Sequence, residues 1–388
     1  MNNLTGSANI IRTKRIRANS VSIPQAKRIY FPELDGLRFL AFLIVFIVHH
    51  SIFSKTSYYS KIFDNAWVVV DLFFVLTAFL FTKLLIAEYK KTKTISFKKF
   101  YIRHIFRIWP IYFLIISLSF LALIFKHQAI TNDIWIRLIG LVTFSDNIIA
   151  STHGLNTLPF TLHLWAIGYE EQFCLLIPIV TLLLIRSSLK LRLICFLLVI
   201  FLFNIIRIVF IVNKAPYPSI YVLPVTHFES ILLGIVMGFG GADFILKKTK
   251  PLILQLTCIL FFILLLLLPN NEASISYWHI ASYSCAGITA ALLLHTVLNN
   301  NYLKQALSKK ILVYLGKRSY GLFVYHLLGI SLANFMVTHI TAIPSTPLTS
   351  LLYSLTFTII IALVSCEIIE KPFLNLKKKF QVIATRPV

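Results

Sequence analysis

The sequence has little charge, and acidic residues are especially few. Only 13% of its 388 residues are charged, with 14 Asp or Glu against 37 Lys or Arg, whereas 58% are hydrophobic. This composition excludes an ordinary water-soluble domain. A net charge of +23 would suggest nucleic acid in a soluble protein. In so hydrophobic a chain it indicates instead a membrane protein whose basic residues set the topology, with membrane lipids and not nucleic acid as surroundings.

Motifs for disulfides, metals and secretion are also missing. The five cysteines lie inside apolar stretches without CxxC or His/Cys spacing, so neither a disulfide framework nor a metal site is expected. There is no internal repeat. A cleavable signal is not expected, because the basic tail before the first apolar stretch is about 38 residues long, more than the n-region of a signal peptide.

Apolar stretches dominate what is present. A spanning helix needs about 20 mostly apolar residues. Eleven such stretches can be drawn, and one of them, 134–150, is interrupted by polar residues, so it is the doubtful candidate for a span. The ten clearer stretches are 39–54, 66–87, 106–125, 162–185, 193–212, 220–240, 251–269, 277–298, 319–340 and 348–369.

The basic residues favour ten spans over eleven, since short cytoplasmic loops are enriched in Lys and Arg. With a cytoplasmic N-terminus and 134–150 outside, 30 of the 37 basic residues fall in cytoplasmic segments. If 134–150 spanned, the 16 basic residues of the later cytoplasmic segments would face outward. We therefore predict an all-α integral membrane protein with about ten transmembrane helices and both termini in the cytoplasm. The expected parts are a basic tail (1–37), a transmembrane domain (38–372) and a second basic tail (373–388).

Titratable residues at membrane depth are costly, so each is a candidate functional residue. Arg38 and His49 are eleven positions apart, close to three helical turns, so they share one face about 16 Å apart. Asp71 lies at a depth similar to that of His49 on the next span. A carboxylate there could hold the tautomer of the imidazole, as an acid does beside a general-base histidine.

A second group follows the second span. Arg103 and Arg107 are four apart on one helix face and lead into the third span, with His104 between them. These three residues could bind the phosphates of an anionic cytosolic cofactor. The neighbouring lysines are interpreted as topological signals that face anionic lipid.

Six pieces of the chain resemble the membrane-bound acyltransferase 3 family, in the family's order, between about residues 30 and 376. They are Pro32-Glu-Leu-Asp-Gly-Leu-Arg38 with His49, Val70-Asp71-Leu-Phe-Phe-Val-Leu-Thr-Ala-Phe79, Phe100 to Pro110, Leu164-Trp165 with Glu170-Glu171-Gln172-Phe173, Ser319-Tyr-Gly-Leu with His326, and Glu370-Lys-Pro-Phe373.

The resemblance implies an enzyme of the bacterial inner membrane that moves an acyl group, usually acetyl from cytosolic acetyl-CoA, to a hydroxyl of a surface glycan or lipid-linked glycan. It places the family's Arg and presumed catalytic His on Arg38 and His49. The family's arginine pair falls on His104 and Arg107, so the chain departs from the pattern at His104, where Arg103 is the alternative. The extra esterase-like domain of many relatives is not expected.

Several points stay open at this stage. His49 acts either as a general base or through a covalent acyl-histidine. Glu170 and Glu171 either bind the acceptor or pack between helices. His326 matches a family position that has no assigned role. All three are candidate substrate-binding residues. The acceptor, the acyl chain and the oligomeric state cannot be read. A proton-coupled transporter is the alternative function, since ten spans with buried His, Asp and Glu would suit it, although the half-symmetry typical of transporters is absent.

Overall fold

The structure is a computed structural model, and it describes residues 28–50, 66–154, 158–241, 246, 248–267, 276–339, 346–383 and 385. Within these residues every regular element is helical, which confirms the predicted fold class. Most of the predicted N-terminal tail lies outside the described residues, as do positions 51–54 of the first predicted span.

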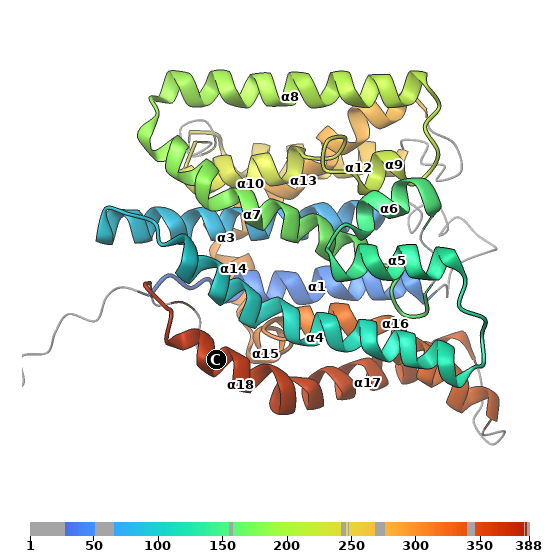
Figure 1. Cartoon of the computed structure of the whole chain (residues 1–388). Coiled ribbons are helices and arrows are strands. Elements are labelled where there is room, and N and C mark those ends of the chain that lie inside the picture. The colour runs from blue at the N-terminus through green and yellow to red at the C-terminus, as the bar shows by residue number, and fades with distance from the viewer. Residues whose placement is uncertain are drawn as a thin grey trace, which may run out of the picture.

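Seven helices in the described part are long and apolar enough to cross a membrane, and they lie side by side in Figure 1. This arrangement is that of a multi-pass membrane protein. They are α3 (Val69–Thr92), α4 (Phe97–Phe125), α7 (Trp165–Arg186), α8 (Leu189–Val212), α13 (Trp278–Asn299), α16 (Ser319–His339) and the continuous run Pro347–Lys378. That run joins α17 (Pro347–Ser365), a π-helical turn (Cys366–Glu370) and α18 (Lys371–Lys378).

Three of the predicted spans form shorter or more polar helices. They are α1 (Pro32–His49), α10 (Glu229–Phe239) and α12 (Pro251–Leu267). The first half of α1 contains Glu33, Asp35 and Arg38, and α10 has only 11 residues. Each predicted stretch thus contains a helix, but the count of ten spans and the sides of the termini stay predictions.

The doubtful stretch 134–150 does not form a long helix. It forms α5 (Asn132–Val142) and α6 (Asp146–His153), of 11 and 8 residues, too short to cross about 30 Å of hydrocarbon. Arg137 on α5 donates from Nη2 to Asp146 Oδ2 at 2.8 Å. The charged residues that interrupt the apolar pattern therefore pair with each other. In Figure 1, α5, α6 and the short α9 (Ser219–Val222) lie at the end of the bundle opposite α18.

Close helix contacts place α1 in the interior of the bundle. A Cβ atom at Gly36 of α1 would clash with the carbonyl oxygen of Leu307, at the end of α14 (Asn301–Leu307). A Cβ at Gly316, the last residue of α15 (Lys310–Gly316), would clash with the Asp35 carbonyl. The glycines let two backbones meet α1 within a turn of Arg38, in the way that small residues bring membrane helices together.

Candidate active site

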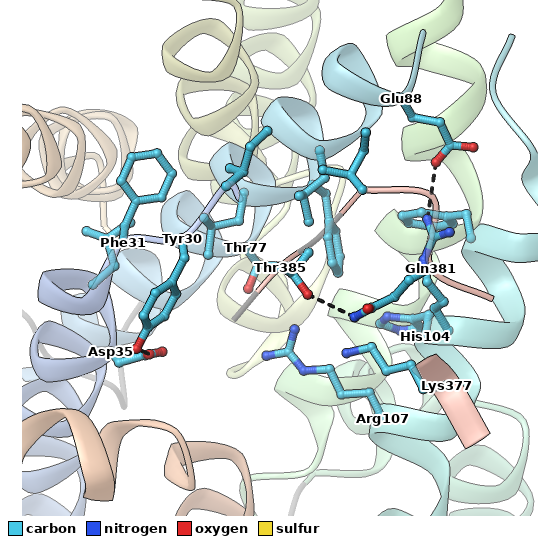
Figure 2. Close-up of a pocket in the computed structure, with 18 of the residues that line it drawn as sticks. Tyr30, Phe31, Asp35, Thr77, Glu88, His104, Arg107, Lys377, Gln381 and Thr385 are labelled. Carbon is cyan, nitrogen blue, oxygen red and sulfur yellow. Dashed lines mark hydrogen bonds and ion pairs between the residues drawn. The ribbon is translucent and has the colours of Figure 1, made fainter. Parts of the chain in front are cut away.

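A cavity opens at the end of the bundle where the described chain begins and ends. It is lined by the beginning of α1, the last turns of α3, the first turns of α4 and the C-terminal segment, residues 371–383 and 385 (Figure 2). Its volume is about 1080 Å³, including the open mouth. All four residues predicted to contact the acyl donor line this cavity: Arg38, Arg103, His104 and Arg107. The structure thus brings these residues of α1 and α4 together around one cavity.

The connection between α3 and α4 fixes the first turns of α4. The Glu88 carboxylate accepts a hydrogen bond from the Ser96 backbone N–H at 2.9 Å and one from Arg103 Nη2 at 3.3 Å. Arg103 Nη1 also donates to the Phe380 carbonyl at 2.9 Å. The Arg103 guanidinium therefore connects α3, α4 and the C-terminal segment.

His104 contacts an acidic side chain inside the bundle. Its Nε2 lies 2.6 Å from Glu171 Oε1 on α7, and the second carboxylate oxygen accepts a longer bond from Trp109 Nε1 at 3.5 Å. The histidine that replaces an arginine of the family pattern is thus fixed by an acid. The structure places Glu171 near the cavity, since Glu171 contacts a residue of the cavity wall and not the groups around His49. Glu170 interacts electrostatically with Arg38 and Arg107 at the same end.

The cavity combines positive charge with an apolar and aromatic lining. Its charged side chains are Arg38, Arg103, Arg107 and Lys377 against Asp35 and Glu88. Asp35 accepts a hydrogen bond from the Tyr30 hydroxyl at 3.0 Å. The apolar part of the lining comes mainly from Phe31, Leu34, Leu80, Phe81, Leu84 and Phe100. Such a lining fits an anionic ligand that also has an aromatic ring and an aliphatic arm.

Three histidines meet near the other end of α1. The ring centre of His49 lies 4.9 Å from that of His326 on α16 and 6.5 Å from that of His163, in the turn before α7. His163 and His326 are 4.4 Å apart. The structure thus brings together His49 and His326, which the sequence predicted separately. Among the described residues that line the cavity, none belongs to this group.

The tautomer of His49 is set by its own helix. His49 Nδ1 lies 2.9 Å from the Val45 carbonyl oxygen. A carbonyl only accepts, so Nδ1 carries the proton of the neutral ring and Nε2 is the basic nitrogen. The turn of α1 that precedes His49 therefore fixes the tautomer of His49, which is the role that was predicted for Asp71.

Asp71 has a different partner, which corrects the prediction that it orients His49. Its Oδ1 accepts from His227 Nε2 at 2.8 Å and from the Ser230 hydroxyl of α10. His227 Nδ1 lies 3.0 Å from the Tyr221 carbonyl, so both ring nitrogens of His227 have an oxygen partner. Equal depth in the membrane did not mean a shared face, because Asp71 lies on the side of α3 that packs against α10.

Comparison with known proteins agrees with this geometry. Residues 31–366 match the family model of the acyltransferase 3 domain, described as an acyltransferase domain. The chain belongs to the acyltransferase 3 family. No solved structure shows a significant match.

The curated relatives of this acyltransferase 3 chain are longer proteins. OatA of Staphylococcus aureus (strain NCTC 8325 / PS 47), an O-acetyltransferase, is 27% identical over 376 residues, which are 92% of this chain and 59% of OatA. SACOL0978 of Staphylococcus aureus (strain COL) is 27% identical over 362 residues, which are 89% of this chain and 57% of SACOL0978. Its name as an O-acetyltransferase is provisional. The chain thus spans somewhat over half the length of these relatives.

Two residues of this acyltransferase 3 chain that lie at the candidate site were not predicted from the sequence. His163 stands at the outer edge of the predicted span 162–185, at a depth comparable to that of His49, and that edge position was the available signal. Lys377 belongs to a run of three lysines in the predicted C-terminal tail, and nothing local distinguishes it from its neighbours. Only the packing of the tail against the cavity distinguishes Lys377 from the two lysines that follow it.

Proposed function

We propose that this protein is an O-acyltransferase of the bacterial cytoplasmic membrane. It takes an acyl group, with acetyl favoured, from cytosolic acyl-CoA and transfers it to a hydroxyl of a cell-surface glycan or lipid-linked glycan. The family membership supports membrane acyl transfer, and the names of the relatives support an oxygen acceptor in those proteins. The observation that carries the proposal is that one helix, α1, connects the cationic cavity to the histidine group.

The donor site is the cavity. The nucleotide part of coenzyme A has a pyrophosphate and a 3′-phosphate, and Arg38 and Arg107 supply guanidinium groups suited to such anions. Phe31, Phe81 and Phe100 offer ring faces and edges for adenine and for the apolar part of the pantetheine arm. No metal is needed for this recognition, because the protein supplies the positive charge.

The distance between the two groups suits an extended thioester arm. Eleven residues separate Arg38 from His49, about 16 Å along a helix at 1.5 Å per residue. The lining of the cavity reaches Arg38 and Thr77 and includes none of the three histidines. We therefore propose that side chains between these levels move when the arm enters.

His49 is the proposed catalytic residue. With the proton on Nδ1, Nε2 accepts the proton of the acceptor hydroxyl as its oxygen attacks the thioester carbonyl carbon. The new C–O ester bond forms, the C–S bond breaks, and the proton passes to the departing thiolate of coenzyme A. In the competing route, Nε2 attacks the thioester carbonyl carbon, the C–S bond breaks, and the thiolate of coenzyme A leaves an acyl-histidine. The acceptor hydroxyl then attacks the acyl-histidine, the C–N bond breaks, and the hydroxyl proton is released as the ester forms. His326 and His163 surround this position and would contact the reacting groups or the acceptor.

Reconstituted transfer tests the proposal. Purified protein in lipid nanodiscs receives acetyl-CoA labelled in the acetyl group together with a panel of glycans. We expect label in an ester on one glycan, and a fall of about a hundredfold to ten-thousandfold in the His49→Ala variant, the usual contribution of a general base. His50→Ala is the matched control, because His50 Nε2 bonds instead to Ser354 of α17 at 3.1 Å.

Two results would contradict the proposal. Undiminished transfer by His49→Ala would reject the catalytic assignment. An intact thioester with every acceptor, in protein that nonetheless transports one of the glycans, would favour the transporter alternative.

A further inference from the structure

The C-terminal segment, defined as residues 371–383 and 385, packs against the donor cavity. Phe373 and Phe380 lie against Phe106 of α4, with ring centres 6.2 and 6.1 Å apart. The Phe380 carbonyl accepts from Arg103, and the Val382 carbonyl accepts from Lys91 Nζ at 3.1 Å. Two elements far away in sequence, α3 and α4, therefore fix the position of this segment.

Four side chains of the segment form part of the cavity wall: Lys377, Gln381, Ile383 and Thr385. Gln381 donates from Nε2 to the Thr385 hydroxyl at 3.1 Å, which holds the wall together after α18 ends. Figure 2 shows the Lys377 side chain alongside that of Arg107, extended in the same direction.

We propose that Lys377 is a binding residue for a phosphate of the acyl donor, and that the C-terminal segment is a wall of the donor site and not only a topological tail. This inference rests on the proposed function, because it assigns a new residue to the same site.

The contacts of Arg103 support this assignment. Arg103 was predicted to bind phosphate, but its Nη1 donates to Phe380 and its Nη2 to Glu88. In this arrangement Arg103 acts as a positioning residue for the segment. Lys377, which that segment presents beside Arg107, supplies a cation to the same anion site.

The two neighbouring lysines provide an internal comparison. Lys378 and Lys379 follow Lys377 directly, but neither is among the residues that line the cavity. Lys378 Nζ donates instead to Asn375 Oδ1 at 2.9 Å on the exposed side of α18. Successive positions on a helix point about 100° apart, so only one residue of this run can face the cavity at that level.

Donor binding to the full chain in phosphatidylcholine nanodiscs tests the proposal. We expect Lys377→Ala to weaken coenzyme A binding about tenfold or more, as loss of a charge-assisted hydrogen bond does. Lys377→Arg should retain most of the affinity, and Lys378→Ala should bind as the wild type does. A loss seen with coenzyme A but not with 3′-dephospho-coenzyme A would assign Lys377 to the 3′-phosphate. An equal loss with both would assign it to the pyrophosphate, and either result supports the proposal.

Wild-type affinity in Lys377→Ala, together with a clear loss in Arg107→Ala, would overturn this inference and leave the proposed function intact. A lipid phosphate is the other source of the same chemistry. If Lys377→Ala changes the binding of phosphatidylglycerol and not that of coenzyme A, the assignment to the donor is also overturned. If wild-type protein binds no coenzyme A at all, the proposed function fails as well, so the two failures are distinguishable.

Discussion

Asp71→Ala should destabilise the fold and leave the chemistry of His49 unchanged. The variant removes the acceptor of two hydrogen bonds, from His227 Nε2 and from the Ser230 hydroxyl. It leaves the buried His227 ring without the carboxylate that it contacts. Removing one partner of a buried ion pair costs about 3–5 kcal/mol, or about a hundredfold to several thousandfold in the folding equilibrium.

Thermal unfolding of purified protein in one detergent measures this loss, and transfer per folded molecule measures the chemistry. Asp71→Asn is the milder comparison, because the amide keeps an oxygen that can accept from His227 while the charge disappears. We expect its loss of stability to be smaller than that of Asp71→Ala, with the pH dependence of turnover the same as in the wild type for both variants.

The reasoning would be refuted by the opposite pattern. If Asp71→Ala unfolds at the wild-type temperature but loses turnover and shifts its pH profile, Asp71 acts on His49, as its predicted depth in the membrane suggested. Because stability and pH profile are measured on the same preparation, the two roles are separable.

Three further predictions follow from individual contacts. Arg207→Ala breaks the buried ion pair of α8 with Glu229 and should cost about 3–5 kcal/mol of stability, measured by thermal unfolding; an unchanged melting temperature would show that this pair does not hold α8. Gly36→Ala places a methyl group against the Leu307 carbonyl, so folded yield in the membrane should fall sharply, and normal yield would contradict the close approach of α1 and α14. Glu171→Gln removes the charge that fixes His104, so donor affinity should fall about tenfold to a hundredfold while turnover at saturating donor stays near the wild-type value; a loss confined to turnover would argue against a donor-side role.

The cationic end of the candidate site was predictable from the sequence because its determinants are local. Arg103 and Arg107 are one helical turn apart, and the short connection between α3 and α4 keeps them near the start of a span. The pattern of the first span placed Arg38 at the same end. Local periodicity and the side of each loop were therefore enough to bring three cations to one end of the bundle.

The contacts around His49 and Asp71 were not predictable in the same way. Hydropathy gives the depth of a residue in the bilayer but not the direction in which its side chain points around the helix axis. The partners of Asp71 and of His49, namely His227 and His326, come from segments more than 150 residues away in sequence. Which helix packs on which face is decided by close contacts, such as that of Gly234 of α10 against Val75 of α3, and a single sequence does not show these pairings.

The placement of Arg207 has a consequence for the order of synthesis. Only Arg207 and Ile211 of α8 are buried, so most of this helix faces lipid. Arg207 lies five residues before the end of α8, so its insertion costs less than the about 2.5–3.5 kcal/mol of an arginine at a helix centre, and the many Leu, Ile and Phe residues of α8 can offset that cost. The carboxylate of Glu229 is made 22 residues later, about one to four seconds at ordinary rates of translation. The Ile280 carbonyl, which also accepts a hydrogen bond from Arg207, is made later still, so Arg207 has all these partners only after the start of α13 has been synthesised.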